Sequence, residues 1–440
     1  MLPTKLQPLR GALAFLLAAA LISAKSPLNF DFPYNATNPV PFVATVDPEF
    51  IKQTVLKAAL YRPSIDLVDN DEINGDWREG PDQAFMSDIA EYWSKSYDWS
   101  QSEHEIFSNF SHYAVTIPDG GGNYDHPVSF HFVHETSDND NAIPLLVLHG
   151  WPSTHLEWAK VIGPLVSPED KSSQAFHVVA PDLPGYGFSP APTHSGLGAS
   201  QMGAALDQLM KKLGYNRYAL AGTDLGHFIG LTMNQQVPDS IIGYYSDMWY
   251  VAPNATDLVR YEQNQTTAEE SKFIETYQYF TTNRYPWGPT HSIAPLGVGQ
   301  ALTDSPVGFA GWIIFFTKQL SDNYQYTFNE IITNTMLLLL QGTYSNIRLY
   351  REVFLKDIPK LRHTEVPAGA GIYGFPTLEP EIARYWADPP RNWIERVSNL
   401  HFYEHHEEGG HFPAINIPDI WVGDVRTFFG DLSMVNRAEK

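Results

Sequence analysis

The sequence has 440 residues and a net charge of −22, with 43% hydrophobic and 13% aromatic residues. The apolar share excludes an intrinsically disordered chain, and the acidic balance disfavours nucleic acids and anionic membrane surfaces as partners. The chain contains no cysteine, which excludes disulfides, thiolate metal sites and a cysteine nucleophile.

Residues 1–24 have the pattern of a secretory signal peptide. Lys5 and Arg10 precede an apolar run, Gly11 to Ala24, that is short for a membrane span. We expect a protein that is secreted or held in the lumen of the secretory pathway, with no stable membrane insertion after cleavage. An uncleaved anchor is the alternative. In this setting four N-x-S/T sequons become candidate glycosylation sites, at Asn35, Asn109, Asn254 and Asn264.

Residues 25–140 form a first region with mixed patterns. A Pro/Asn-rich lead favours extended chain, and apolar residues at helical spacing predict helices over 48–60 and 82–95. Another helix is expected after Ser100, and a strand over 128–134.

Residues 141–252 alternate between strand and helix patterns. Apolar runs at 144–149, 176–182 and 218–222 are typical of buried parallel strands, and helical patterns separate them. The alternation predicts an α/β fold with a parallel sheet, in which ligands bind at the carboxyl ends of the strands.

Residues 253–365 interrupt this alternation with a helix-rich, aromatic stretch that contains Pro/Gly breaks. We interpret it as a helical lid inserted between core strands. Alternation resumes over 366–440, with a strand at 368–376, another at 399–403 and a closing helix at 418–432.

The stretch Gly222-Thr-Asp-Leu-Gly226 lies between an apolar strand and an amphipathic helix. Small residues on both sides of a sharp strand-to-helix turn are typical of a nucleophile elbow. Here the central residue is Asp224 rather than serine, so the predicted chemistry is attack by a carboxylate on carbon to form an ester. An ordinary Gly-flanked turn is the alternative.

His411 follows a predicted strand and two glycines near the end of the chain. An order of nucleophile, acid and histidine along the chain is that of α/β-hydrolase triads. His411 is therefore the expected base that activates water, and Glu379 or Glu381 is the expected acid that orients it. A solvated surface acid is the alternative for either glutamate.

The segment His149-Gly-Trp-Pro152 ends a predicted strand. Backbone N–H groups at such a strand end can form an oxyanion hole. We expect the amides of Trp151 and Leu225 to be the donors, and Trp151 could otherwise be a plain core residue.

The chain resembles the microsomal-type epoxide hydrolases of the α/β-hydrolase superfamily. The resemblance rests on Asp76-Trp77, Tyr97-Asp-Trp99, His149-Gly-Trp-Pro152, Asp182-Leu-Pro-Gly-Tyr-Gly-Phe-Ser189, Gly222-Thr-Asp-Leu-Gly226, Asp304-Ser-Pro-Val-Gly308, Ile347-Arg-Leu-Tyr350 and Glu408-Gly-Gly-His-Phe-Pro413. It implies an N-terminal arm over the lid across 25–140, an α/β-hydrolase core in two parts, and no cofactor or metal.

The resemblance also implies two lid tyrosines that hydrogen-bond the epoxide oxygen. Tyr350 matches the second of them, and the first falls at Trp287 or, with a small gap, at Tyr285. Along with Trp287, His149 and Pro152 are expected to line the substrate pocket.

The predicted function is addition of water to a small apolar epoxide to give a vicinal diol, through a covalent ester on Asp224. An epoxide-opening cyclase, a haloalkane dehalogenase and a catalytically silent binding protein of the same fold are the alternatives. Trp151 and Trp287 keep dehalogenation open, because halide release needs indole donors. The sequence leaves the oligomeric state open.

Overall fold

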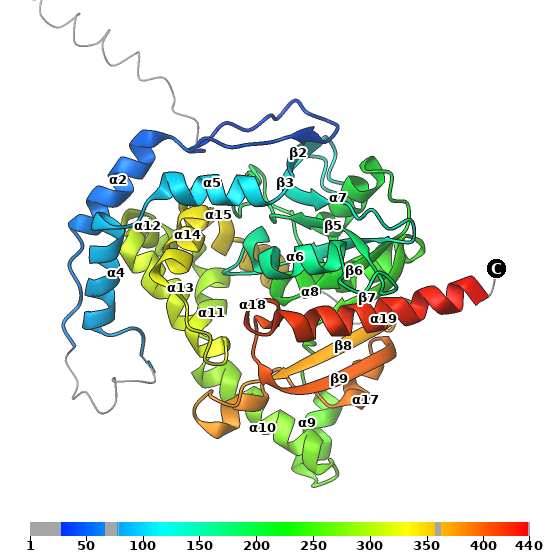
Figure 1. Cartoon of the computed structure of the whole chain (residues 1–440). Helices are drawn as coiled ribbons and strands as arrows, with labels where there is room; N and C mark the ends of the chain where they lie inside the picture. Colours follow the sequence, from blue (N-terminus) through cyan, green and yellow to red (C-terminus); the bar gives the residue numbers. More distant parts are fainter. Residues whose placement is uncertain (1–27, 67–76, 78, 357–361, 439–440) are drawn as a thin grey trace, which may run out of the picture.

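A nine-stranded sheet crosses the part of the chain that the computed structural model describes, which is residues 28–66, 77, 79–356 and 362–438. The strand order is β1-β2-β3-β5-β4-β6-β7-β8-β9 (Figure 1). The first three strands and β5 pair antiparallel, and the remaining pairs are parallel. The strands are β1 (Val40–Pro41), β2 (His112–Ile117), β3 (Val128–Glu135), β4 (Ile143–Leu148), β5 (Phe176–Pro181), β6 (Tyr218–Gly222), β7 (Ile241–Ser246), β8 (Pro367–Gly374) and β9 (Asn399–Gly409).

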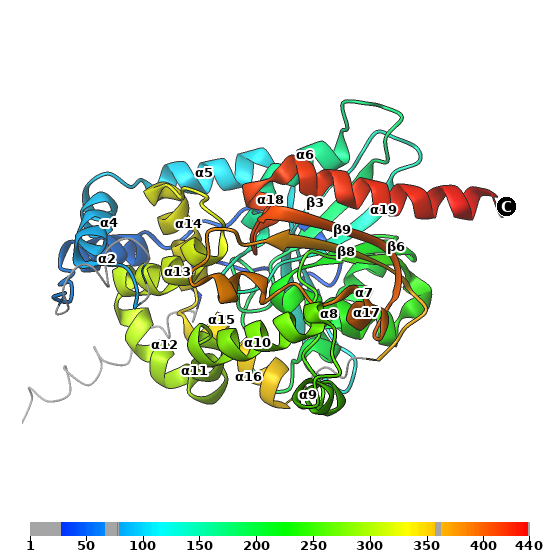
Figure 2. The ribbon, with the colours of Figure 1, turned by 90° about the horizontal axis from the view of Figure 1, so that it is seen from below.

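Helices cover both faces of the sheet, so the central strands are buried on two sides. Figure 2 shows α6 (Ala159–Val166) and α19 (Pro418–Ala438) on one face and α7 (Ala199–Lys212) with α8 (Asp224–Gln236) on the other. Successive side chains of a strand point to opposite faces. Leu145 and Val147 of β4 accordingly join the core under α6 and α19, whereas Leu146 and Leu148 join the core under α7 and α8. A continuous apolar run therefore forms a strand here, as the sequence predicted.

The N-terminal region supplies three helices beside the sheet: α2 (Pro48–Ala59), α4 (Gln83–Lys95) and α5 (Trp99–Asn109). An aspartate side chain caps the start of each one, because its oxygen accepts a hydrogen bond from a backbone N–H of the first turn. Helices α2 and α4 pack against α13 (Pro306–Leu320) of the inserted segment. The predicted signal peptide lies outside the described residues.

The predicted lid segment lies between β7 and β8 and is helical. It contains α9 (Ala255–Glu262), α10 (Ala268–Asn283), α11 (Trp287–Ile293), α12 (Pro295–Asp304), α13 (Pro306–Leu320), α14 (Phe328–Leu339), α15 (Tyr344–Ile347), α16 (Leu349–Arg351) and the π-helical turn η4 (Glu352–Lys356). Capping boxes start several of these helices. Thr327 and Glu330, for example, exchange side-chain and backbone hydrogen bonds at the start of α14.

The chain then returns to the sheet and closes it. After β8 come η5 (Glu381–Tyr385) and α17 (Arg391–Glu395), and after β9 come α18 (Pro413–Asn416) and α19. Strand β9 runs to Gly409, beyond the predicted end at residue 403. It is the edge strand of the sheet, and many of its side chains are exposed. Its His and Glu side chains can therefore remain in water while its backbone pairs with β8. Two short 3₁₀ turns, η2 (His155–Trp158) and η3 (Pro238–Ser240), complete the core.

Membrane-spanning helices were searched for in the described part of the chain. None of its helices combines the length and apolar character needed to cross a bilayer.

Candidate active site

A sharp turn between β6 and α8 places Asp224 at the first position of the helix. Its backbone has φ of +47°, a left-handed conformation that aspartate tolerates better than most residues. A Cβ atom on Gly222 would lie 2.7 Å from the carbonyl oxygen of Gly226, and one on Gly226 would lie 2.2 Å from that of Leu148. Both flanking glycines are therefore required sterically, and the turn has the geometry of a nucleophile elbow.

The two carboxylate oxygens of Asp224 have different partners. The backbone N–H of Trp151 donates a hydrogen bond of 2.8 Å to Oδ1. Oδ2 lies 3.5 Å from Nε2 of His411. A Cβ atom on Gly150 would lie 2.2 Å from Oδ1, so only glycine lets the β4 loop approach this closely. One oxygen is thus held by the predicted oxyanion amide, and the other faces the predicted base.

The second predicted oxyanion donor lies next to the nucleophile. Leu225 is the second residue of α8. The first N–H groups of a helix have no partner within the helix, so they are available to an anion.

His411 reaches the site through a turn after β9. Gly409 and Gly410 both have positive φ, +116° and +64°, and the backbone N–H of His411 donates to the carbonyl of Leu320 at the end of lid helix α13. The imidazole is buried, and its Nδ1 atom has no hydrogen-bond partner within the part of the chain that the structure describes. The base is therefore positioned by its backbone, and its second ring nitrogen remains unpaired.

Neither predicted acid is brought to His411. Glu379 is half-exposed and forms an ion pair with Arg384, and Glu381 is exposed at the start of η5. Among the described residues, no hydrogen bond or ion pair joins either glutamate to the imidazole. Trp386 stacks 5.9 Å from the His411 ring instead, because the segment after β8 buries its aromatic residues and turns its acids outward.

A buried acid that the sequence analysis missed, Asp247, directly follows β7. Its Oδ2 atom accepts a hydrogen bond of 2.7 Å from the indole of Trp421, and its Oδ1 atom has no hydrogen-bond partner. The available signal was an acidic residue at the carboxyl end of an apolar run, Ile241 to Ser246, the same position that Asp224 occupies after β6.

Asp224 and His411 open into a cavity of about 400 Å³ between the core and the lid. Its other lining residues are mostly apolar and include Trp151, Pro152, Phe228, Met248, Tyr250, Phe280, Tyr285, Trp287, Phe316, Leu320, Tyr350, Phe354, Leu355, Trp386 and Phe412. Pro152 and Trp287 therefore line the cavity, as the sequence predicted.

His149 is not among the residues that line this cavity, in contrast to the prediction. Its side chain is fully buried below the β4 loop. Nδ1 hydrogen-bonds the carbonyl of Gly150, and Nε2 accepts a hydrogen bond of 3.0 Å from the backbone N–H of Leu183. His149 connects two loops of the core rather than facing a ligand.

Two phenols, those of Tyr285 and Tyr350, line the cavity together with the nucleophile. Burial raises the pKa of Tyr350 well above its ordinary value, and the negative charge of Asp224 raises it further. The pKa of Tyr285 is raised by the same two causes in the same order. Both phenols are therefore protonated at neutral pH and can donate a hydrogen bond to a bound oxygen.

The two candidates for the first lid position, Tyr285 and Trp287, both have side chains that line the cavity. The Tyr285 ring lies over Gly288, where a Cβ atom would be 2.1 Å from it. The Trp287 side chain lowers the pKa of the Tyr350 phenol, against the larger effects of burial and charge. Tyr285 thus occupies the space over the glycine, and Trp287 lies close enough to Tyr350 to affect its pKa.

A lid asparagine joins the lid to the core beside the cavity. The Oδ1 atom of Asn346 accepts a hydrogen bond of 3.2 Å from the indole N–H of Trp151, and its backbone carbonyl accepts one of 3.1 Å from the hydroxyl of Tyr186. These contacts fix the Trp151 ring, which packs edge-on against Tyr350.

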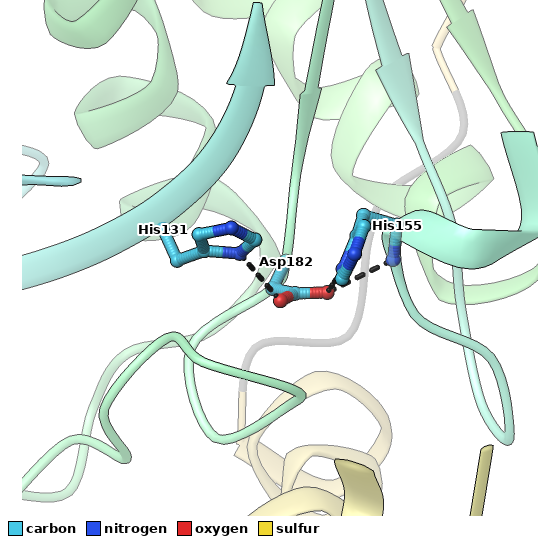
Figure 3. A group of neighbouring side chains, drawn as sticks. All are labelled: His131, His155 and Asp182. Atoms are coloured by element: carbon cyan, nitrogen blue, oxygen red, sulfur yellow. Dashed lines mark hydrogen bonds and ion pairs between the residues drawn. The ribbon is translucent and has the colours of Figure 1, made fainter. Parts of the chain in front are cut away.

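One group of side chains has the composition of a metal site. Figure 3 shows His131, His155 and Asp182, whose candidate ligand atoms all lie within 4.8 Å of one another. Each imidazole instead hydrogen-bonds Asp182, at 2.7 Å from His131 Nδ1 and 2.9 Å from His155 Nδ1. A metal would have to displace the protons of these bonds, so the geometry fits a hydrogen-bonded cluster better than a metal centre.

Comparison with known proteins agrees with this geometry. Residues 39–158 match the family model for the epoxide hydrolase N terminus, and residues 143–264 match the model for the alpha/beta hydrolase fold. A protein of Stigmatella aurantiaca (strain DW4/3-1) with the name "Putative epoxide hydrolase" is 30% identical over 370 residues, which cover 81% of this chain and 78% of that protein. The chain belongs to the epoxide hydrolase family. It is a hydrolase that acts on the ether bond of epoxides.

Other epoxide hydrolases are also similar to this chain in sequence or in structure. Epoxide hydrolase 1 of Sus scrofa is 27% identical, over 79% of this chain and 80% of its own length. Among solved structures, the juvenile hormone epoxide hydrolase of the silkworm Bombyx mori superposes with a TM-score of 0.78 at 24% identity, over 91% of this chain and 96% of that one. The Aspergillus niger epoxide hydrolase gives a TM-score of 0.74 at 24% identity, over 92% of this chain and 100% of that one. The predicted family resemblance and α/β-hydrolase fold are confirmed.

Proposed function

We propose that this epoxide hydrolase adds water to a small apolar epoxide and releases a vicinal diol through a covalent ester on Asp224. One observation carries the proposal. Asp224 has one oxygen held by the Trp151 amide and the other 3.5 Å from His411, at a cavity that two protonated phenols also line. The remaining steps follow from these contacts.

Ester formation uses the oxygen that the amide does not hold. Oδ2 of Asp224 attacks an epoxide carbon, and the bond from that carbon to the ring oxygen breaks. The phenols of Tyr285 and Tyr350 hydrogen-bond the developing alkoxide, and one of them transfers its proton to it. The products of this step are a hydroxyalkyl ester on Asp224 and one tyrosinate.

Ester hydrolysis uses His411 and the oxyanion amide. His411 removes a proton from water, and the hydroxide attacks the carbonyl carbon of the ester. The ester carbonyl oxygen is Oδ1, so the negative charge develops where the Trp151 N–H already donates. When the ester bond breaks, the leaving alkoxide takes the proton from His411. The new Asp224 carboxyl returns its own proton to the tyrosinate, which restores the enzyme.

The lining of the cavity supports an apolar substrate. Phe228, Phe280, Phe316 and Phe354 contribute apolar surface, and the polar groups are concentrated at the nucleophile, the base and the phenols. A pocket of this kind orients an apolar ligand by a few polar contacts at the reacting group.

Isotope labelling tests the ester directly. With enzyme in excess over an epoxide in ¹⁸O-labelled water, a single turnover through the ester should give an unlabelled diol and place the label in the Asp224 carboxylate, as seen by peptide mass spectrometry. Direct addition of water to the epoxide would instead label the diol in that first turnover. That result would overturn the ester mechanism.

Dehalogenation receives less support from the indole contacts. The indole N–H of Trp151 donates to Asn346. A halide would have to compete with Asn346 for this donor. We therefore expect no detectable halide release from haloalkanes when epoxides are turned over.

We further propose that the protein enters the secretory pathway and is glycosylated. The apolar segment at residues 11–24 motivates this proposal, and all four acceptor side chains are exposed: Asn35, Asn109, Asn254 and Asn264. N-terminal sequencing of the protein purified from its source should begin near Lys25, and peptide mass spectrometry should find glycans on some of the four sequons. An N-terminus at Met1 would contradict cleavage.

A further inference from the structure

The imidazole of His411 lacks the partner that a general base requires. Nε2 faces Asp224, so Nδ1 must carry the proton when Nε2 acts as a base. That Nδ1 atom is buried and has no hydrogen-bond partner. An unpaired buried N–H destabilises the folded state and leaves the ring orientation unset. A buried acceptor close to His411 would remove both defects.

Asp247 offers the complementary unpaired atom. It follows β7, whose last residue, Ser246, pairs in the parallel ladder with Gly222 at the end of β6. Asp224 and Asp247 therefore leave neighbouring strands at the same edge of the sheet. The Asp247 side chain is buried, and its Oδ1 atom has no hydrogen-bond partner. The other oxygen, Oδ2, is fixed by the indole of Trp421 on α19, which packs against β7 (Figure 1).

The electrostatics link Asp247 to His411. Burial raises the pKa of Asp247 to about 6, against the lowering effects of the Thr223 hydroxyl, the Trp421 indole and the charge of His411. The pKa of the buried acid Glu157 is raised mainly by its own burial, and the charge of Asp247 raises it further. The charge of Asp247 also contributes to the raised pKa of three buried tyrosines, Tyr244, Tyr245 and Tyr373. Among these groups, His411 is the one whose protonated form would stabilise the Asp247 carboxylate.

We propose that Asp247, rather than Glu379 or Glu381, is the carboxylate that orients His411. The assignment rests on the proposed ester mechanism. Nδ1–H of His411 donates to Oδ1 of Asp247, which fixes the tautomer with Nε2 free and stabilises the imidazolium that forms when water is deprotonated. Asp247 does not touch the substrate and is a positioning residue. The nucleophile, the acid and the base then follow β6, β7 and β9.

The test separates the two chemical steps in four variants of the full chain. Styrene oxide is mixed with excess enzyme, the reaction is quenched at intervals, and intact-protein mass spectrometry follows the ester. Asp247→Asn keeps the shape of the side chain and an acceptor for the Trp421 indole. We expect it to form the ester at the wild-type rate and to hydrolyse it at least about 100-fold more slowly, as in serine-protease triads with the same change. Glu379→Gln and Glu381→Gln should hydrolyse the ester at the wild-type rate.

His411→Gln distinguishes failure of this assignment from failure of the ester mechanism. If it accumulates no ester on Asp224, the ester mechanism is wrong and the role of Asp247 falls with it. If it accumulates ester while Asp247→Asn hydrolyses the ester normally, the assignment to Asp247 alone is overturned. A stall in Glu379→Gln or Glu381→Gln would also overturn it.

Two further measurements exclude a purely structural effect. In the wild type, ester hydrolysis should decline as the pH falls through about 6, because the Asp247 carboxylate becomes protonated and can no longer accept from Nδ1–H. Asp247→Asn should shift the midpoint of this limb, because only the requirement for unprotonated His411 then remains. Trp421→Phe removes the hydrogen bond to Oδ2 and part of a buried ring, and it should slow the same step more weakly.

Asp207→Asn is a matched control for the change of a buried aspartate to asparagine. Asp207 bonds Tyr218 and Lys211 in the core, away from the cavity residues. It should alter the melting temperature without slowing ester hydrolysis. If Asp247→Asn does not fold, the effect of Trp421→Phe on ester hydrolysis still decides the assignment, and its absence would contradict it.

Discussion

Two buried groups of histidines and carboxylates lie in this core, and their polar atoms are used differently. In the histidine–aspartate cluster (His112, His131, His155 and Asp182), Asp182 accepts hydrogen bonds from both His131 and His155 and from the backbone N–H groups of His155 and Phe188 (Figure 3). At the active site, His411 Nδ1 and Asp247 Oδ1 have no hydrogen-bond partner. In the cluster, both oxygens of the Asp182 carboxylate accept hydrogen bonds. At the active site, polar atoms are left without such partners and are available for chemistry.

The charge balance of the two groups also differs. His112 bonds His131 at 2.8 Å and the carbonyl of Ile106 at 2.9 Å, and His131 bonds Asp182. A carbonyl and a carboxylate both accept, so these three hydrogen bonds need three protons, one more than two neutral imidazoles hold. Burial lowers the pKa of both imidazoles, so burial acts against the third proton that these contacts require. Burial alone would raise the pKa of Asp182, yet His155 and His131 hold it well below its ordinary value.

The cluster joins β3, the turn η2 and the end of β5, so its hydrogen bonds connect elements that are distant in the sequence. A buried carboxylate whose oxygens are both hydrogen-bonded stabilises the fold, whereas the unpaired atoms at the active site remain available for reaction.

Asp224→Asn should abolish turnover. A neutral amide cannot form the ester, and loss of a nucleophile costs at least about 10,000-fold in rate. Asparagine tolerates positive φ and keeps an acceptor for the Trp151 amide, so the melting temperature should change little. Steady-state rates and thermal unfolding are measured on fresh protein, before slow deamidation restores aspartate. Substantial turnover in such protein would exclude Asp224 as the nucleophile.

Asp182→Asn should act on stability instead. Removing the charge leaves the extra proton of the cluster uncompensated, at a cost of about 3–5 kcal/mol in the free energy of unfolding. Activity per folded molecule should not change. Urea unfolding measures the first quantity, and titration of active sites through the ester measures the second. A loss of activity without a loss of stability would place the cluster in the chemistry.

The same variant should show a specific pH dependence. The pKa of Asp182 is lowered in the folded state, so its stabilising contribution is present above the ordinary carboxyl pKa and is lost as the pH falls toward the folded-state value. The gap in stability between wild type and Asp182→Asn should therefore narrow below about pH 4. A gap that stays constant down to acid unfolding would argue against the charged form of Asp182.

Tyr350→Phe and Tyr285→Phe should each slow ester formation by roughly 10- to 100-fold. Each removes one hydrogen bond to the developing alkoxide, worth about 1.5–3 kcal/mol. Ester hydrolysis should be nearly unaffected, because His411 and the Trp151 amide are unchanged. Single-turnover kinetics separate the two steps. If Tyr285→Phe is silent and Trp287→Phe is not, Trp287 is the second donor.

His155→Asn should have the smallest effect. The amide N–H of asparagine can replace Nδ1–H toward Asp182, and Nε2 of His155 has no partner to lose. We expect about 1 kcal/mol lower stability and normal activity. A thermal-unfolding comparison with Asp182→Asn checks this ranking. A larger loss than in Asp182→Asn would mean that packing of the ring, rather than the hydrogen bonds, holds the cluster together.

The sequence by itself was sufficient for features that depend on neighbouring residues. The apolar runs predicted β4, β5 and β6, since a strand buried on both faces needs continuous apolar side chains. The flanking glycines predicted a tight turn at Asp224, and the sterics at Gly222 and Gly226 explain why no larger residue fits. The glycine pair before His411 likewise indicated a turn that carries a functional side chain.

Other features depended on contacts between residues that are far apart in the chain. Packing of the segment after β8 decides which carboxylate can approach His411, because it turns Glu379 and Glu381 outward. Asp247, 164 positions from His411, is instead buried at the end of β7. Packing of the lid decides that Tyr285 and Trp287 both line the cavity, because the ring of Tyr285 lies over Gly288. A hydrogen bond from Leu183 keeps His149 out of the cavity. Local sequence patterns do not predict such contacts. The interaction energies of these contacts arise only when β-strand pairing and helix packing bring the side chains together.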